Sequence, residues 1–138
     1  MERNSNSTKS VPRVMVVDDS ITIRTNLASM LQNHGCEVLT CEDGFEALSK
    51  AASFAPNLVF TDIVMPKVDG YELISLLRAN PMFVRIPIIT LSSKSGVFDI
   101  ARGKLIGCDD YITKPVSLRA LQSVLERHLP DHVPANAA

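Results

Sequence analysis

The stretch VMVVDDS, residues 14–20, is the most informative part of this chain, because four apolar residues run directly into two aspartates. Two more apolar runs end on a charged residue in the same way, LVFTD at residues 58–62 and YITKP at residues 111–115. Parallel strands direct their carboxyl ends to one edge of a sheet, where open α/β sheets bind their ligands. If the three runs are such strands, one pocket collects four charged side chains: Asp18, Asp19, Asp62 and Lys114.

Apolar runs of strand length alternate with segments of helical periodicity along most of the chain. The strands are predicted at about residues 13–17, 37–40, 58–61, 86–91 and 110–113. Helices are predicted to begin at the caps Ser20, Asp43 and Ser117 and near the pair Asp69-Gly70. A further helix is predicted over residues 97–105. The second and third helices are expected to bury Leu48, Ala51, Ala52, Leu73, Leu76 and Leu77. The alternation predicts an α/β fold, a doubly wound five-stranded parallel sheet of the flavodoxin-like (βα)5 type with strand order 2-1-3-4-5.

The composition is that of a globular protein, with 46% hydrophobic and 21% charged residues among 138. A formal net charge of -1 argues against general nucleic-acid binding, and no apolar run reaches the roughly 18 residues that span a membrane. The polar N-terminus has no signal-peptide core, so we expect a cytoplasmic protein. We also expect a disordered lead-in over residues 1–11, one domain over residues 12–130 and a short flexible tail over residues 131–138.

The three carboxylates of the expected pocket would repel one another, and a bound cation is one remedy. Hard oxygen ligands favour Mg²⁺, which often bridges to phosphate. An aspartate nucleophile that forms an acyl phosphate is established chemistry, and Lys114 and the Ser92 hydroxyl would neutralise and bind the phosphoryl oxygens. Each residue alone has an ordinary interpretation, Asp19 and Ser20 as helix caps and Asp62 as a turn residue. It is the joint pattern that indicates phosphoryl transfer.

Four segments of the chain resemble the response-regulator receiver domains of two-component signalling, the family typified by CheY. They are VMVVDDS at residues 14–20, LVFTDIVMPKVDG at 58–70, IPIITLSS at 86–93 and GCDDYITKP at 107–115. The resemblance covers about residues 12–129, nearly the whole chain. It implies that the predicted domain is a receiver that takes part in a phosphorelay.

The resemblance also implies which residues bind the phosphoryl group and the metal. Asp62 matches the phosphoacceptor of the family. Asp18 and Asp19 match its acidic pair, which binds Mg²⁺ together with Asp62 and the main-chain carbonyl of Val64. Valine at position 64 departs from the polar residue often found there, and that side chain borders the route of the water that attacks the acyl phosphate.

Three further positions match the family's phosphate-binding and switch residues. Lys114 corresponds to the phosphate-binding lysine, whose bond to Pro115 is usually cis in this family. Ser92 corresponds to the switch hydroxyl residue and Tyr111 to the switch aromatic residue. Val116 stands where many members have phenylalanine, a departure that hardly affects the chemistry.

A narrower resemblance is carried by LSSKSGVFDIARG at residues 91–103 and DGFEAL at residues 43–48. These segments are similar to single-domain receivers of type IV pilus twitching-motility systems, which are chemotaxis-like pathways. The narrower resemblance implies a role in twitching or chemotactic motility.

Two partners follow from the resemblance: a histidine kinase as phosphodonor and a downstream output protein. The output protein is expected on the face formed by the helix at 97–105, the strand at 110–113 and the helix that follows Ser117. We expect no nucleic-acid or membrane partner, and a monomer or weak dimer. The protein is expected not to be an enzyme, apart from self-phosphorylation from small donors and autodephosphorylation.

Three alternatives remain open on the sequence. A haloacid-dehalogenase-like phosphatase uses similar residues, but its nucleophile lies on the first strand in a D-x-D arrangement, whereas Asp62 follows the third predicted strand and residue 64 is valine. A flavodoxin-like flavin binder would place a phosphate where Asp18 and Asp19 repel it. A non-phosphorylated scaffold receiver would not need the acidic pair, the acceptor and the lysine together.

Overall fold

The computed structural model describes residues 11–93 and 97–130, with the backbone alone for residues 97–100. Strands and helices alternate along this part of the chain. The strands are β1 (Arg13–Val17), β2 (Glu37–Cys41), β3 (Leu58–Asp62), β4 (Ile88–Ser92) and β5 (Asp110–Thr113). The α-helices are α2 (Ile21–Asn33), α3 (Gly44–Phe54), α4 (Gly70–Arg78), α5 (Val97–Ile106) and α6 (Leu118–His128), and a short 3-10 helix, η1 (Pro81–Phe83), follows α4.

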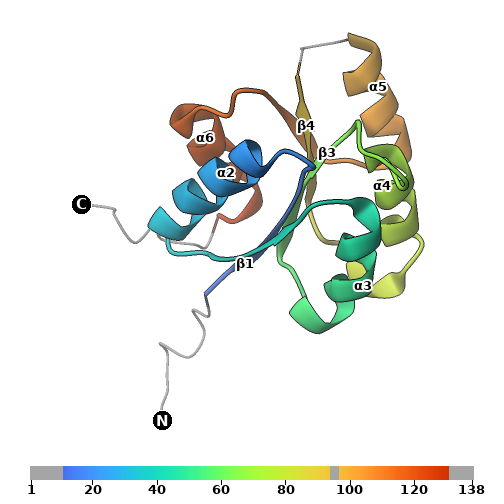
Figure 1. The fold of residues 1–138 in the computed structure, drawn as a ribbon, viewed down its shortest axis with the longest axis horizontal. Helices are drawn as coiled ribbons and strands as arrows, with labels where there is room; N and C mark the ends of the chain where they lie inside the picture. Colours follow the sequence, from blue (N-terminus) through green and yellow to red (C-terminus); the bar gives the residue numbers. More distant parts are fainter. Residues whose placement is uncertain (1–10, 94–96, 131–138) are drawn as a thin grey trace.

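The five strands form one parallel sheet in the order β2-β1-β3-β4-β5. Helices α2 and α6 cover one face of the sheet, and α3, α4 and α5 cover the other (Figure 1). The predicted flavodoxin-like (βα)5 fold and its strand order are therefore confirmed. The strand order reverses between β1 and β3, which places a crevice between the ends of these two strands.

The central strands are buried on both faces. In β1, Val14 and Val16 pack on the side of α2 and α6, while Met15 and Val17 pack on the side of α3 and α4. Successive side chains of a strand point to opposite faces of the sheet. A strand covered on both sides therefore needs an unbroken apolar run, and this is the pattern that VMVV shows.

The four predicted helix starts are confirmed, and a capping side chain lies at each of them. In each case the side-chain oxygen accepts a hydrogen bond from the main-chain N–H three residues further on. Such a cap stabilises a helix by about 1 kcal/mol. The caps that begin the helices after β1, β2, β3 and β5 are Ser20, Asp43, Asp69 and Ser117.

Some predicted strand boundaries were wrong by one or two residues. β2 and β3 each extend one residue further, to Cys41 and Asp62, so Asp62 is the last residue of its strand. β4 begins at Ile88, not at residue 86. Pro87 has no N–H to donate, although its carbonyl still accepts a hydrogen bond from the N–H of Val59 at 3.0 Å.

Two residues expected to be buried are exposed. Ala52 of α3 faces solvent, whereas Ala47 and Ala51, one helical turn apart, face the core. Leu76 of α4 is 49% exposed, while Leu73, Ile74 and Leu77 are buried. In both helices the exposed residue lies about 100° round the axis from its buried neighbour, outside the stripe that meets the sheet.

The terminal segments predicted as a lead-in and a tail lie outside the described residues, apart from Val11. Among the helices that the structure describes, none is both long and apolar enough to span a bilayer.

Candidate functional site

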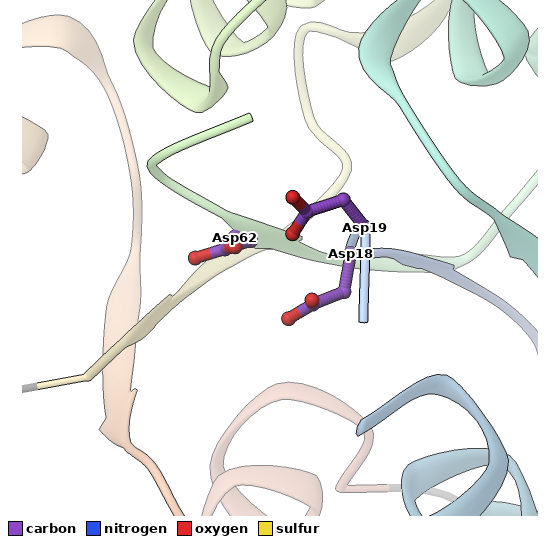
Figure 2. Close-up of side chains that lie close together, drawn as sticks. All are labelled: Asp18, Asp19 and Asp62. Carbon is purple, nitrogen blue, oxygen red and sulfur yellow. The ribbon is translucent and has the colours of Figure 1, made fainter. Parts of the chain in front are cut away.

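The register of β1 against β3 brings the acidic residues together. Val17 lies opposite Thr61, so the residues that follow them, Asp18 after β1 and Asp62 at the end of β3, lie at the same edge of the sheet. The oxygens that Asp18, Asp19 and Asp62 direct toward one another all lie within 4.8 Å (Figure 2). Asp18 is fully buried and Asp62 is 7% exposed, while Asp19 is exposed at the mouth of the site.

Lys114 follows the edge strand β5, and its side chain reaches the acidic residues at the ends of β1 and β3. Its main-chain N–H donates to the carbonyl of Ser92 at 2.6 Å, which extends the pairing of β4 with β5 by one residue. Its Nζ lies 2.8 Å from Asp18 Oδ2 and 3.2 Å from Asp62 Oδ1. One ammonium group thus contacts two of the three clustered carboxylates, and the site keeps an excess of negative charge.

The environment shifts the pKa of two groups in the site. Burial raises the pKa of Asp62 above its ordinary value, and the charge of Asp18 adds to this, against the opposing effects of Lys114 and the Ile63 N–H. Burial alone would lower the pKa of Lys114, but its hydrogen bond to Asp18 and the charge of Asp62 raise it overall. The lysine therefore stays charged beside a carboxyl whose ionised form is disfavoured.

The oxygens of the site fit a hard divalent cation. Asp18 Oδ1 accepts a hydrogen bond from the Ser20 N–H at 2.9 Å. Asp18 Oδ2 is buried, and apart from the ion pair with Lys114 it has no hydrogen-bond partner among the described residues. A buried carboxylate oxygen that meets a single lysine keeps a lone pair for a further ligand, and three clustered carboxylates are the ligands that Mg²⁺ prefers.

The start of α4 packs against the main chain of Asp62 and Ile63 and holds it in place. The Gly70 N–H donates to the Ile63 carbonyl at 2.8 Å. A Cβ at Gly70 would collide with the carbonyl oxygen of Asp62 and would lie 2.8 Å from Ile63 Cα. Only glycine therefore lets the helix approach the strand end that presents Asp62. The Ile63 N–H in turn donates to Asp62 Oδ1 at 2.8 Å.

The other sequence-predicted residues lie around this pocket, and not all of them reach it. Ser92 is buried at the end of β4, beside Lys114. Tyr111 is 39% exposed on β5, outside the acidic cluster. The side chain of Val64 is 80% exposed, two residues after Asp62, and the role of its carbonyl as a metal ligand stays a prediction. The bond between Lys114 and Pro115 is cis, as the resemblance implied.

Sequence reasoning missed two residues that support the site. The glycine in the pair Asp69-Gly70 was noted only as a helix start, although a glycine directly after a cap is a signal of close backbone approach. Arg24 donates from Nη1 to the main-chain carbonyl of Asp18 at 2.8 Å. Nothing in the sequence marks Arg24, because the contact depends on how α2 lies against the end of β1.

Comparisons with known proteins agree with this geometry. Residues 14–126 match the response regulator receiver domain family. Protein PilG of Pseudomonas aeruginosa is 44% identical over 137 residues, which cover 99% of this chain and 98% of PilG. Protein PilH of the same organism is 36% identical over 82% of this chain and 97% of PilH. The chain spans less than half of longer relatives such as the transcriptional regulator PhoP of Bacillus subtilis, which is 40% identical over 80% of this chain and is covered to 45%.

Two solved structures share the fold. The chemotaxis protein CheY4 of Vibrio cholerae superposes with a TM-score of 0.82 at 32% identity, covering 86% of this chain and 99% of CheY4. The receiver domain of a sensor histidine kinase from Pseudomonas aeruginosa gives a TM-score of 0.80 at 27% identity, covering 88% of this chain and 99% of that domain. That domain was solved with a magnesium ion in its active-site cleft. The chain therefore belongs to the response regulator receiver domain family, as a CheY-like member related to PilG along nearly its whole length.

Proposed function

We propose that this protein is a two-component response regulator that accepts a phosphoryl group from a histidine kinase on Asp62. One observation carries the proposal: three carboxylates lie within 4.8 Å of one another, and a single lysine bridges two of them. An arrangement with this excess of negative charge supports binding of a cation and, with it, of a phosphoryl group.

In this proposal Mg²⁺ is held by Asp18, Asp19 and Asp62 and by the main-chain carbonyl of Val64. When bound, the metal neutralises the charge of the phosphoryl oxygens. A carboxylate oxygen of Asp62 attacks phosphorus, the new O–P bond forms, and the N–P bond to the donor histidine breaks with its electron pair returning to the imidazole. Lys114 then exchanges part of its contact with Asp18 for a phosphoryl oxygen.

The test is chemical labelling of the acceptor. Acetyl phosphate and Mg²⁺ should produce an acid-labile adduct on Asp62 that mass spectrometry can map. Asp62→Asn should abolish the adduct, because an amide cannot form the acyl phosphate. Glu37→Gln removes an exposed carboxylate at the opposite edge of the sheet and serves as the matched control. Equal labelling of Asp62→Asn would defeat the assignment, and no labelling of the wild type would favour a scaffold receiver.

The proposed output is phosphorylation-dependent protein binding by the face of α5, β5 and α6. Ser92 lies next to Lys114 along the sheet, and Tyr111 lies three residues before it on β5. Phosphorylation is proposed to draw the Ser92 hydroxyl toward the phosphoryl oxygens and to let the Tyr111 ring turn inward. Both changes would favour one pre-existing conformer.

Beryllofluoride, which mimics the acyl phosphate, tests this output. Added with Mg²⁺, it should shift amide NMR signals near Asp62 and across about residues 92–120. Shifts confined to the Asp62 pocket would reduce Ser92 and Lys114 to phosphate ligands and remove the switch from the proposal.

The pathway that we propose is chemotaxis-like control of twitching motility in the cytoplasm, with the protein as a monomer or weak dimer. The support is the similarity to PilG and PilH over nearly the full length of each. Phosphotransfer profiling against the histidine kinases of the source organism would identify the donor.

A further inference from the structure

Arg24 ties the first turn of α2 to the end of β1. Its Nη1 donates to the main-chain carbonyl oxygen of Asp18 at 2.8 Å, across six residues of sequence. The side chain is half-buried, and its own N–H continues the helix by donating to the Ser20 carbonyl at 3.0 Å. The guanidinium therefore acts from a rigid element on the segment that carries the acidic pair.

Asp18 is fixed through three of its polar groups. Its N–H donates to the Cys41 carbonyl at 3.1 Å, its Oδ1 accepts from the Ser20 N–H at 2.9 Å, and its carbonyl accepts from Arg24. The carbonyl shares a planar peptide unit with the N–H of Asp19. Holding that carbonyl therefore fixes the orientation of the peptide that joins Asp18 to Asp19. The side chain of Asp19 is exposed, so this peptide is what directs it.

We propose that Arg24 is a positioning residue for the metal-binding acidic pair, an inference that rests on the proposed function. By orienting the peptide between Asp18 and Asp19, it aims the exposed carboxylate of Asp19 at the buried ones of Asp18 and Asp62. Residues that orient metal ligands without touching the metal commonly affect affinity strongly.

The charge of Arg24 and its hydrogen bond make opposite predictions. A cation near the site repels Mg²⁺, so loss of the charge alone should strengthen metal binding. Loss of the hydrogen bond frees the Asp18–Asp19 peptide, so metal binding should weaken because the ligands are no longer pre-arranged. The sign of the change in Mg²⁺ affinity therefore separates positioning from electrostatics.

The experiment is Mg²⁺ titration of the intact protein, followed by the amide NMR shift of Ile63. Arg24→Gln should weaken Mg²⁺ binding by about tenfold or more, as found when residues that orient metal ligands are removed. Arg119→Gln, which removes an exposed arginine of α6, is the matched control and should leave the affinity unchanged. Unchanged or tighter binding by Arg24→Gln overturns the proposal.

A second variant and a metal-free measurement protect the test from a folding defect. Arg24→Lys keeps the charge but loses the planar guanidinium. If Arg24 positions the acidic pair, this variant should bind Mg²⁺ more weakly, whereas a pure charge effect predicts an unchanged affinity. In metal-free protein the amide of Asp19 should exchange hydrogen faster in both variants, with helix amides late in α2 unaffected. Exchange unchanged at Asp19 argues against the proposal. A wild type that binds no Mg²⁺ would overturn the proposed function instead, so the two failures are distinguishable.

Discussion

Two clusters of charged residues lie at opposite edges of the sheet, and they differ in how completely they are satisfied. At the amino edge of β4 and β5, Arg78 donates to the carbonyls of Gly107 at 2.9 Å, Phe83 at 3.0 Å and Ile86 at 2.7 Å. Its Nη2 also lies 2.6 Å from Asp109 Oδ2, and that oxygen accepts the Ile88 N–H at 2.8 Å.

At the carboxyl edge the balance is reversed. Of three clustered carboxylates, Lys114 contacts two, and one buried oxygen of Asp18 has only that lysine for a partner among the residues described. In the Arg78 cluster every guanidinium nitrogen and Asp109 Oδ2 has a partner within the protein, so the cluster holds loops together. The acidic cluster has carboxylate oxygens that can still accept a hydrogen bond or bind a cation, as a ligand site requires.

The largest expected effect is the loss of stability when the Arg78 cluster at the amino edge is broken. Arg78→Met should lower the free energy of unfolding by about 1–3 kcal/mol, because three part-buried carbonyls and the Asp109 carboxylate lose their donor. Urea denaturation measures this, with Arg85→Met as the control at an exposed arginine, where a change within about 0.5 kcal/mol is expected. A loss as small as that of the control would show that the amino-edge cluster is not structural.

The next effect concerns metal at the carboxyl edge. Mg²⁺ at 100 times its Kd should stabilise the wild type by about 2.7 kcal/mol. Asp19→Asn removes a charged ligand and should weaken affinity at least tenfold, so the same Mg²⁺ concentration should stabilise the variant by only about 1.4 kcal/mol. Thermal unfolding with and without Mg²⁺ gives both values, with the exposed Glu126→Gln as control. Equal stabilisation of Asp19→Asn and wild type would mean that Asp19 is no ligand.

The smallest effect is the stability of the metal-free protein. Asp62→Asn should raise the free energy of unfolding near pH 7 by on the order of 1 kcal/mol, an ordinary size for a point substitution. Burial and Asp18 disfavour the ionised carboxyl, so its pKa is raised. The folded state then holds this proton more tightly than the unfolded state, and the penalty appears as pH rises through the raised pKa.

The pH dependence of this gain is its check. As pH falls toward 3.8, the ordinary value for aspartate, Asp62 becomes protonated in the folded protein and the advantage of asparagine should disappear. Urea denaturation at several pH values measures the difference. An advantage that persists at acid pH would indicate a packing effect and not relief of charge repulsion.

Local patterns predicted much of the molecule because their causes are local. Each helix cap accepts a hydrogen bond from an amide only three residues away, so the pattern is visible in the sequence. The caps are Ser20, Asp43, Asp69 and Ser117. The acidic pocket was also predictable, because right-handed crossovers and a sheet covered on both faces leave few strand orders. Once the order is 2-1-3-4-5, Asp18 and Asp62 must emerge side by side.

The predictions were wrong where burial depends on a single residue step around a helix, or where the start of a strand depends on one missing N–H donor. Leu76 and Ala52 were expected in the core as part of the apolar pattern of their helices, but the way each helix faces the sheet places both outside. Pro87 was included in the predicted strand because proline is tolerated near a strand start, but β4 begins only after it, at Ile88.

The sequence is enough to predict the strand and helix types, the starts of the helices, the strand order and the acidic residues of the pocket. Only the packed structure shows which oxygen of Asp18 meets Lys114, how Arg24 reaches the carbonyl of Asp18, and why Gly70 must be glycine. The reason is physical: patterns of polarity follow from short-range periodicity. Hydrogen bonds between elements depend on distances of a few tenths of an ångström, which exist only after the helices have packed on the sheet.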